Sequence, residues 1–293
     1  MHPVLAEIVQ KHYAAEKARD PNQGRRTTVL RALHKNWPPA PPPTDAQDIE
    51  LGDIDEDLFD YLVEDDAPGI LIRTDYSNDE AWAAFHAKLL SSEQDILTSL
   101  LPPAAEGEAG PSISTSTSTS SGPPQDVDMI PAETAEGEES DDESDDSPPT
   151  SIISIINPEL PEERRLFQKI SNIAALQMIN DVNLRSAPPR PQGTKKVQPP
   201  HPLIDLNDWQ EIYTGKTIWI YDAKSVADES VRLVSSAGDV YGTATGDSWR
   251  ARVSHIPELQ FNMTYLGMQV NFGGLDRWDF PERERNLRES TNL

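Results

Sequence analysis

Two aspartates, Asp75 and Asp222, stand where an α/β enzyme would need them, each directly after an apolar run that is typical of a buried strand. Ligands of open α/β sheets bind beyond the carboxyl ends of the strands. Carboxylates that meet there could hold a hard cation such as Mg²⁺, with Asp79, Asp228 or His255 completing the site. This pattern defines one hypothesis, a metal-assisted hydrolase or phosphotransfer enzyme that uses Asp75 and Asp222.

A structural interpretation of the same residues competes with the catalytic one. An aspartate after a strand commonly forms a turn by bonding its own backbone, and Arg73 could pair with a surface acid. The stretch YGTATGD lacks the GK[ST] of a phosphate-binding loop, and the chain has neither G-x-S-x-G nor H-E-x-x-H. We therefore assign no catalytic residue beyond the two candidates, expect no cofactor and leave a metal site open.

The stretch ILIRTDYSNDEAW, residues 70–82, predicts the elements that would carry Asp75. Its apolar start indicates a buried strand, and SNDE matches a capping box in which the Ser77 hydroxyl and the Glu80 carboxylate cap a helix. Trp82 begins the apolar face of that helix. A strand that leads into a capped helix is the first half of a βαβ unit.

These motifs resemble an uncharacterised domain family of bacteria and fungi, whose members open with a strand close to LLIRTDFSDDxAW. Tyr76 stands at the family's phenylalanine, Tyr221 and Asp222 at a strand ending in Ala-Asp, and residues 269–272 at its closing segment. The resemblance covers about residues 67–100 and 170–275. It implies an α/β domain and carries no activity.

Composition limits the size of the folded part and the kinds of partner. The chain has 293 residues, 26 prolines, 36% hydrophobic residues and a net charge of −25. That charge disfavours nucleic acid and anionic membranes as partners, and no apolar run approaches the length of a membrane span. Because there is no cysteine, disulfides and thiolate metal sites are excluded. We expect an intracellular protein, cytoplasmic or nuclear.

We predict an α/β or α+β fold, a small mixed-sheet domain with flanking helices and a long disordered acidic insertion. The predicted layout is a basic helical arm at 1–37, a proline-rich linker at 38–48, the first part of the domain at 49–101, an acidic Ser/Thr/Pro-rich insertion at 102–150, the second part at 151–275 with a basic proline-rich loop at 185–202, and a charged tail at 276–293.

Several segments allow more specific expectations. The arm should form two helices, which either bind a partner or, as we favour, pack on the domain or form only transiently. Residues 161–181 begin as a helix and end as helix or strand. Apolar patterns predict a short helix at 49–66, a short helix at 205–216 closed by Gly215, strands at 217–222, 230–236 and 248–254, a helical turn at 256–263, and a strand or extended edge at 264–275.

The acidic insertion carries two serines, Ser140 and Ser144, that suit an acidophilic kinase. The charged segments and the lack of an assembled catalytic motif favour a non-catalytic module that binds protein partners. Besides the hydrolase, a second alternative is an acidic regulatory or inhibitor protein that binds a basic partner.

Overall fold

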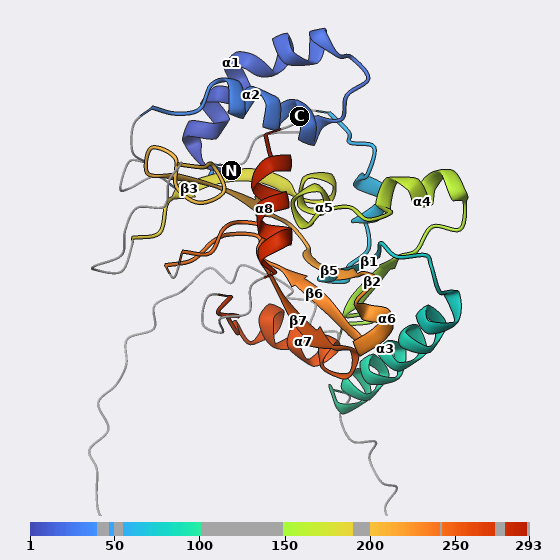
Figure 1. The fold of residues 1–293 in the computed structure, drawn as a ribbon. Coiled ribbons are helices and arrows are strands. Elements are labelled where there is room, and N and C mark those ends of the chain that lie inside the picture. The colour runs from blue at the N-terminus through green and yellow to red at the C-terminus, as the bar shows by residue number, and fades with distance from the viewer. Residues whose placement is uncertain are drawn as a thin grey trace, which may run out of the picture.

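The computed structural model describes residues 1–39, 47–49, 55–100, 149–189, 200–240, 242–272 and 279–291. Within these ranges the chain forms a mixed α/β fold, with a five-stranded sheet, a two-stranded sheet and helices on both faces of the larger sheet (Figure 1). The predicted fold class is confirmed.

The larger sheet is built around the predicted apolar strands. In spatial order its strands are β2 (Ile153–Ile156), β1 (Gly69–Arg73), β5 (Thr217–Tyr221), β6 (Ser230–Val234) and β7 (Ser248–Arg252). Strand β1 runs parallel to both β2 and β5, whereas β6 and β7 are antiparallel to their neighbours. The helix α3 (Asp79–Leu100) connects β1 to β2, so the predicted βαβ unit is present.

Side chains of the central strands alternate between two cores, as the period of a strand requires. Ile70 and Ile72 of β1 lie in one core, whereas Leu71 lies in the other. The second core contains Trp82 and Phe85 of α3, and α7 (Ile256–Tyr265) covers the same face of the sheet (Figure 1). Although α3 has 22 residues, no helix in the described ranges is long and apolar enough to cross a membrane.

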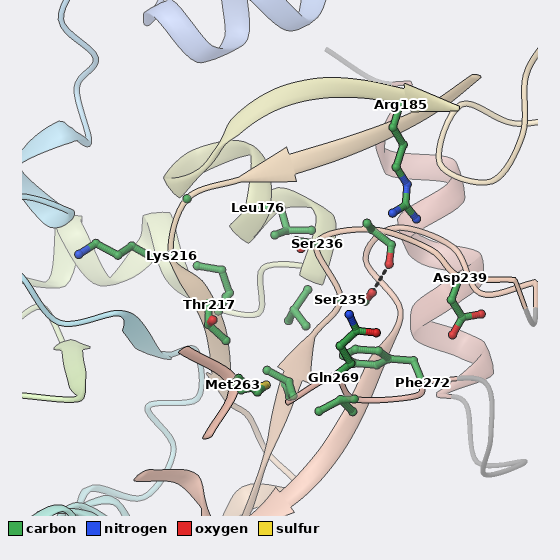
Figure 2. Close-up of a pocket in the computed structure, with 16 residues that line it drawn as sticks. Leu176, Arg185, Lys216, Thr217, Ser235, Ser236, Asp239, Met263, Gln269 and Phe272 are labelled. Atoms are coloured by element: carbon green, nitrogen blue, oxygen red, sulfur yellow. Dashed lines mark hydrogen bonds between the residues drawn. The ribbon is translucent and has the colours of Figure 1, made fainter. Parts of the chain in front are cut away.

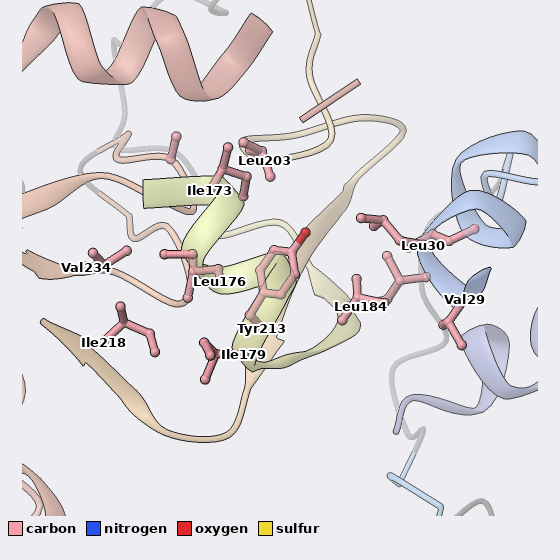
Figure 3. Close-up of a cluster of buried hydrophobic side chains, with 14 of the residues drawn as sticks. Val29, Leu30, Ile173, Leu176, Ile179, Leu184, Leu203, Tyr213, Ile218 and Val234 are labelled. Carbon is pink, nitrogen blue, oxygen red and sulfur yellow. The ribbon is translucent and has the colours of Figure 1, made fainter. Parts of the chain in front are cut away.

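The first core fills the space between the two sheets. The smaller sheet pairs β3 (Asp181–Ser186) with β4 (Trp209–Thr214), and α5 (Asn172–Ile179) lies between it and the larger sheet. Figure 3 shows Leu176 of α5 between Ile218 of β5 and Tyr213 of β4. Each such fully buried aliphatic side chain stabilises the fold by about 1.5–3 kcal/mol.

The basic N-terminal arm packs on this core. It forms α1 (Pro3–Arg19) and α2 (Arg25–Lys35), as predicted. Leu5, Val29, Leu30 and Leu33 are buried in the first core, and Figure 3 shows Leu30 facing Leu184 of β3. The interpretation of the arm as a packed element is therefore confirmed.

Strand β4 corrects the short helix predicted at 205–216. Trp209, Glu211 and Tyr213 lie on one side of this strand, and Gly215 closes a turn into β5 with φ +136°. A Cβ at Gly215 would lie 2.7 Å from Oδ1 of Asn180, the oxygen that accepts from the Lys216 amide. Glycine is required by the turn rather than by a helix end.

Other boundaries also differ from the expectations. Residues 161–181 form α4 (Pro161–Phe167) and α5 before β3 begins, which decides the ambiguity in favour of helix. A short helix was expected at 49–66, and in the described part of that segment, 49 and 55–66, the chain forms only a 3-10 turn, η1 (Asp60–Leu62). A strand or extended edge was expected at 264–275. In the described part of that segment, 264–272, α7 ends and irregular chain without a strand follows, so the strand is wrong there.

The predicted charged tail contains a docked helix, α8 (Phe280–Glu289). The Asp279 carboxylate accepts from the Glu282 amide and caps it. Asn286 is buried, accepts from the Ile173 amide and donates to the Gly246 carbonyl. These contacts make α8 part of the fold, on the face opposite α3 (Figure 1).

A buried carboxylate, that of Glu93, binds the chain where it re-enters the fold after the predicted acidic insertion. Oε1 of Glu93 accepts from the amides of Ile152 and Ile153 at 2.6 and 2.9 Å. This contact joins α3 to the start of β2 on the far side of the insertion. Most of the insertion, residues 102–148, lies outside the described residues, as do Ser140 and Ser144 and most of the linker at 38–48.

The contact between Asp247 and α8 gives a pH-dependent stability. Burial raises the pKa of Asp247 from 3.8 to about 6, although the Arg283 guanidinium, 3.3 Å away, opposes the rise. The folded protein therefore holds a proton that the unfolded chain releases above pH 4. This stabilisation, about 3 kcal/mol, is fully present below about pH 4 and is lost as pH rises through about 6.

Urea unfolding at a series of pH values tests this prediction. The free energy of unfolding of Asp247→Asn, subtracted from that of the wild type, should fall between pH 4 and 6 and then stay constant. The subtraction removes the other carboxylates, whose contributions are common to both proteins. A difference that does not change with pH would contradict the raised pKa.

Candidate functional site

The carboxyl ends of β1 and β5 are the place where the sequence predicted a site. Arg73, the last residue of β1, is buried and is held on every side. Its Nε donates to the Asp75 carbonyl at 3.0 Å and its Nη2 to the Asp79 carboxylate at 2.5 Å. The guanidinium carbon lies 4.9 Å from the Tyr76 ring centroid and 5.1 Å from that of Trp82. Arg73 therefore fixes the loop that leads into α3.

Asp75 has a local partner in the same loop. Its Oδ2 accepts from the Ser77 hydroxyl at 2.7 Å, and its Oδ1 accepts from the Ser77 amide at 3.4 Å. Asn78, rather than Ser77, caps α3 by accepting from the Ala81 amide at 2.9 Å. The predicted capping box of Ser77 and Glu80 is therefore wrong, because Asp75 engages the Ser77 hydroxyl. Trp82 lies on the inner face of α3 as predicted.

Asp222 has a different set of partners. Its Oδ2 is bonded by Nη2 of Arg250 and lies 3.2 Å from Nε of Arg232, while its Oδ1 accepts from Ser225. Nη1 of Arg232 also forms an ion pair with Oε1 of Glu282 in α8, at 3.0 Å. Burial alone would raise the pKa of Asp222, but the Arg250 hydrogen bond and the two positive charges lower it.

The two candidate carboxylates therefore share no bonding partner. Asp75 is bonded within the loop to α3, which covers one face of the sheet, whereas Asp222 is bonded to arginines that face α8 on the other. The charges of both carboxylates act on the buried phenol of Tyr221. Burial raises the pKa of this phenol, the positive charge of Arg73 lowers it, and Asp75 and Asp222 raise it further.

The residues proposed to complete a metal site are also separate. Asp79 pairs with Arg73, Asp228 accepts from Ser230, and His255 lies 3.9 Å from Glu258. In the part of the chain that the structure describes, no three His, Asp or Glu side chains gather in a way that could hold a metal ion. At the carboxyl ends of β1 and β5, the described acidic side chains therefore form hydrogen bonds and ion pairs with neighbouring side chains.

A pocket lies at the opposite end of the sheet, around the start of β5 and the end of β6. It has a volume of about 430 Å³, and Ile218, Leu233 and Val234 contribute to its lining. Figure 2 shows the Arg185 side chain extending from β3 toward Ser235, Asp239 and Gln269. The sequence analysis did not identify this pocket, because its lining comes from several segments that are distant in sequence.

A mainly acidic surface with exposed apolar side chains lies beside α4. Phe59 contacts Phe167 of α4, with ring centroids 6.4 Å apart, and Figure 1 shows the chain around η1 beside α4. We use the term α4 surface for the exposed apolar residues here, Leu58 (70%), Tyr61 (61%), Leu160 (51%) and Leu166 (50%), together with the acids Glu64, Asp66, Glu159, Glu162 and Glu163.

The acids of the α4 surface are not neutralised by the described parts of the chain. None of the five forms an ion pair there, whereas the neighbouring Asp65 lies 3.8 Å from Lys216. Exposed apolar side chains beside a cluster of mainly acidic residues are typical of surfaces that bind other proteins. The sequence indicated the acidic character of 49–66, but only folding brings this segment to α4.

Comparison with known proteins gives no family to which the chain can be assigned. No family model, no curated protein and no solved structure matches it.

Proposed function

We propose that this protein is a non-catalytic interaction module that binds a basic partner protein through the α4 surface. The single observation that carries the proposal is that this surface combines four exposed apolar side chains with five acids that have no ion-pair partner in the described chain. The proposal unites the interaction module expected from the sequence with the alternative of an acidic protein that binds a basic partner.

The chemistry of the surface indicates the kind of partner. A helix with leucines at i, i+3, i+4 and i+7 and with lysines beside them could cover the apolar residues. Its lysines would then face Glu159, Glu162 and Glu163. Complementary charge raises the association rate and gives selectivity more than affinity. The metal-assisted hydrolase is less well supported, because Asp75 and Asp222 are bonded to different partners.

A binding experiment with matched variants tests the proposal. The probe is a labelled helical peptide with the leucine and lysine pattern, and the control peptide has the same composition in scrambled order. We expect the double variant Tyr61→Ala and Leu166→Ala to lose at least about tenfold in affinity, equal to about 1.4 kcal/mol. The matched control, Tyr265→Ala with Leu266→Ala, removes exposed apolar side chains at the end of α7 and should bind as the wild type does.

Charge is tested separately on the same surface. Glu162→Lys with Glu163→Lys should weaken binding, and the affinity of the wild type should fall as salt is raised from about 50 to 300 mM. Equal binding of the ordered and scrambled peptides, or equal losses in the α4 and α7 variants, would refute the proposal.

A further inference from the structure

Arg185 differs from Arg73, Arg232 and Arg250 of the larger sheet in forming no ion pair within the described residues. Arg232 and Arg250 both pair with Asp222, and Arg73 pairs with Asp79. Arg185 forms no ion pair with any carboxylate in the described chain. Burial lowers its pKa, and the charge of Asp239 opposes this only in part. A half-buried cation without a bonded anion is unusual, because burying a charge is costly unless it is paired.

The guanidinium of Arg185 is held in a fixed orientation by neutral groups. Its Nε donates to Oε1 of Gln210 at 2.9 Å, and its Nη2 donates to the Gly238 carbonyl. Gln210 is fully buried and is itself fixed through its donation to the Leu203 carbonyl at 3.2 Å. Nη1 donates to no described protein atom. The arrangement positions one planar donor group in advance, with donor capacity remaining.

The pocket beside Arg185 is mainly apolar at its floor. Ile218, Leu233 and Val234 are almost fully buried, and Met263 and Val270 form part of the lining. A second depression, of about 600 Å³, shares Arg185 and Val270 with the first. Polar side chains, among them Ser235, Asp239 and Gln269, line the rest of the pocket. Volumes of this order that combine apolar and polar lining are typical of sites for small molecules or single side chains.

We propose that this pocket binds a carboxylate attached to an apolar group, with Arg185 bonding the carboxylate and the floor of β5 and β6 contacting the apolar part. A single guanidinium balances one negative charge, and Asp239 beside it disfavours a dianion such as phosphate. Two sources share this chemistry, an apolar residue at the free C-terminus of a partner peptide and a small apolar carboxylic acid. The pocket shares no residue with the α4 surface, so the two proposals can fail independently.

The first experiment measures binding of a labelled peptide that ends in leucine with a free carboxylate, against the same peptide with a C-terminal amide. We expect the acid to bind at least about tenfold more tightly than the amide. Arg185→Gln should abolish that difference. Arg252→Gln, which removes an exposed arginine of β7, should leave it unchanged. Equal binding of acid and amide, or an unchanged preference in Arg185→Gln, would overturn the proposal.

A second variant protects the test against misfolding of Arg185→Gln. Val270→Trp fills the pocket from a partly exposed position and keeps the guanidinium. In this variant the peptide with the free carboxylate should bind only as tightly as the peptide with the C-terminal amide. The thermal unfolding midpoint should stay that of the wild type. Retained preference for the acid in Val270→Trp would overturn the assignment of the apolar floor.

Competition then separates the two sources. Displacement of the labelled peptide by N-acetyl-leucine supports a small carboxylic acid, whereas binding that requires several residues before the terminal leucine supports a peptide C-terminus. Inorganic phosphate is the third competitor. If phosphate displaces the peptide as well as N-acetyl-leucine does, the apolar part of the ligand contributes nothing and the proposal is wrong.

Discussion

Glu211→Ala should lower the free energy of unfolding by about 3–5 kcal/mol, because it removes a fully buried carboxylate that hydrogen-bonds two other side chains. Oε2 of Glu211 lies 2.6 Å from Nε2 of His34, and Oε1 accepts from the Tyr213 hydroxyl at 2.6 Å. The carboxyl group is completely buried. Burial and the adjacent Glu211 carboxylate raise the pKa of Tyr213, which favours the protonated phenol as the donor of this hydrogen bond.

Glu211 joins the N-terminal arm to the rest of the fold, since His34 is in α2 and Tyr213 in β4. Truncation leaves both of these groups without their acceptor and creates a cavity. Glu211→Gln keeps the shape and one acceptor, so it should cost only about 1–2 kcal/mol. Chemical denaturation measures both values, and Glu7→Ala on the exposed side of α1 is the neutral control.

A double-mutant cycle with His34→Ala assigns the effect to the pair. We expect a coupling free energy of about 1–3 kcal/mol between His34 and Glu211. If Glu211→Ala costs less than 1 kcal/mol, or if the two single effects simply add, the contact does not fasten the arm.

Arg73→Ala should have the second large effect, also about 3–5 kcal/mol, because it removes a buried charge that organises the loop before α3. The guanidinium bonds Asp79 and the Asp75 carbonyl, and it stacks between Tyr76 and Trp82. Most of the loss should come from the buried bonds and ring contacts. Asp79 itself is exposed, so its ion pair is screened by water.

Arg73→Lys is the sharper variant at this position. Lysine keeps the charge but has neither the planar fork nor the ring-stacking face of the guanidinium. We expect it to recover less than half of the stability lost in Arg73→Ala. Hydrogen exchange of the first-turn amides of α3 should accelerate in both variants, and Arg165→Ala on the exposed side of α4 should leave it unchanged. Wild-type stability in Arg73→Lys would show that charge alone is sufficient.

The roles of Arg73 and Asp75 show how far local sequence could define the candidate site. The strand and helix around them follow from the apolar pattern of residues 70–72 and from the polar residues before α3. The helix cap was predicted one residue too early, because Ser77 and Asn78 are both good capping residues. Only the position of the Asp75 carboxylate decides which of them is available.

Strand β4 shows why another part of the fold could not be predicted. Gln210 and Glu211 are fully buried although both are strongly polar. A pattern based on apolar spacing therefore missed the strand. Their burial is possible because partners distant in sequence, Arg185 for one and His34 for the other, satisfy them.

The sequence by itself determined the α/β class, the strands at 69–73 and 217–221, the two helices of the arm and the acidic character of the chain, because each depends on neighbouring residues or on composition. Only the tertiary structure decided that Asp75 and Asp222 are bonded to different partners, that the C-terminal segment docks as α8, and that Arg185 lies at a pocket without an ion pair in the described chain. These features depend on which distant side chains meet when the sheet closes on its two cores, and no local pattern of residue types encodes those meetings.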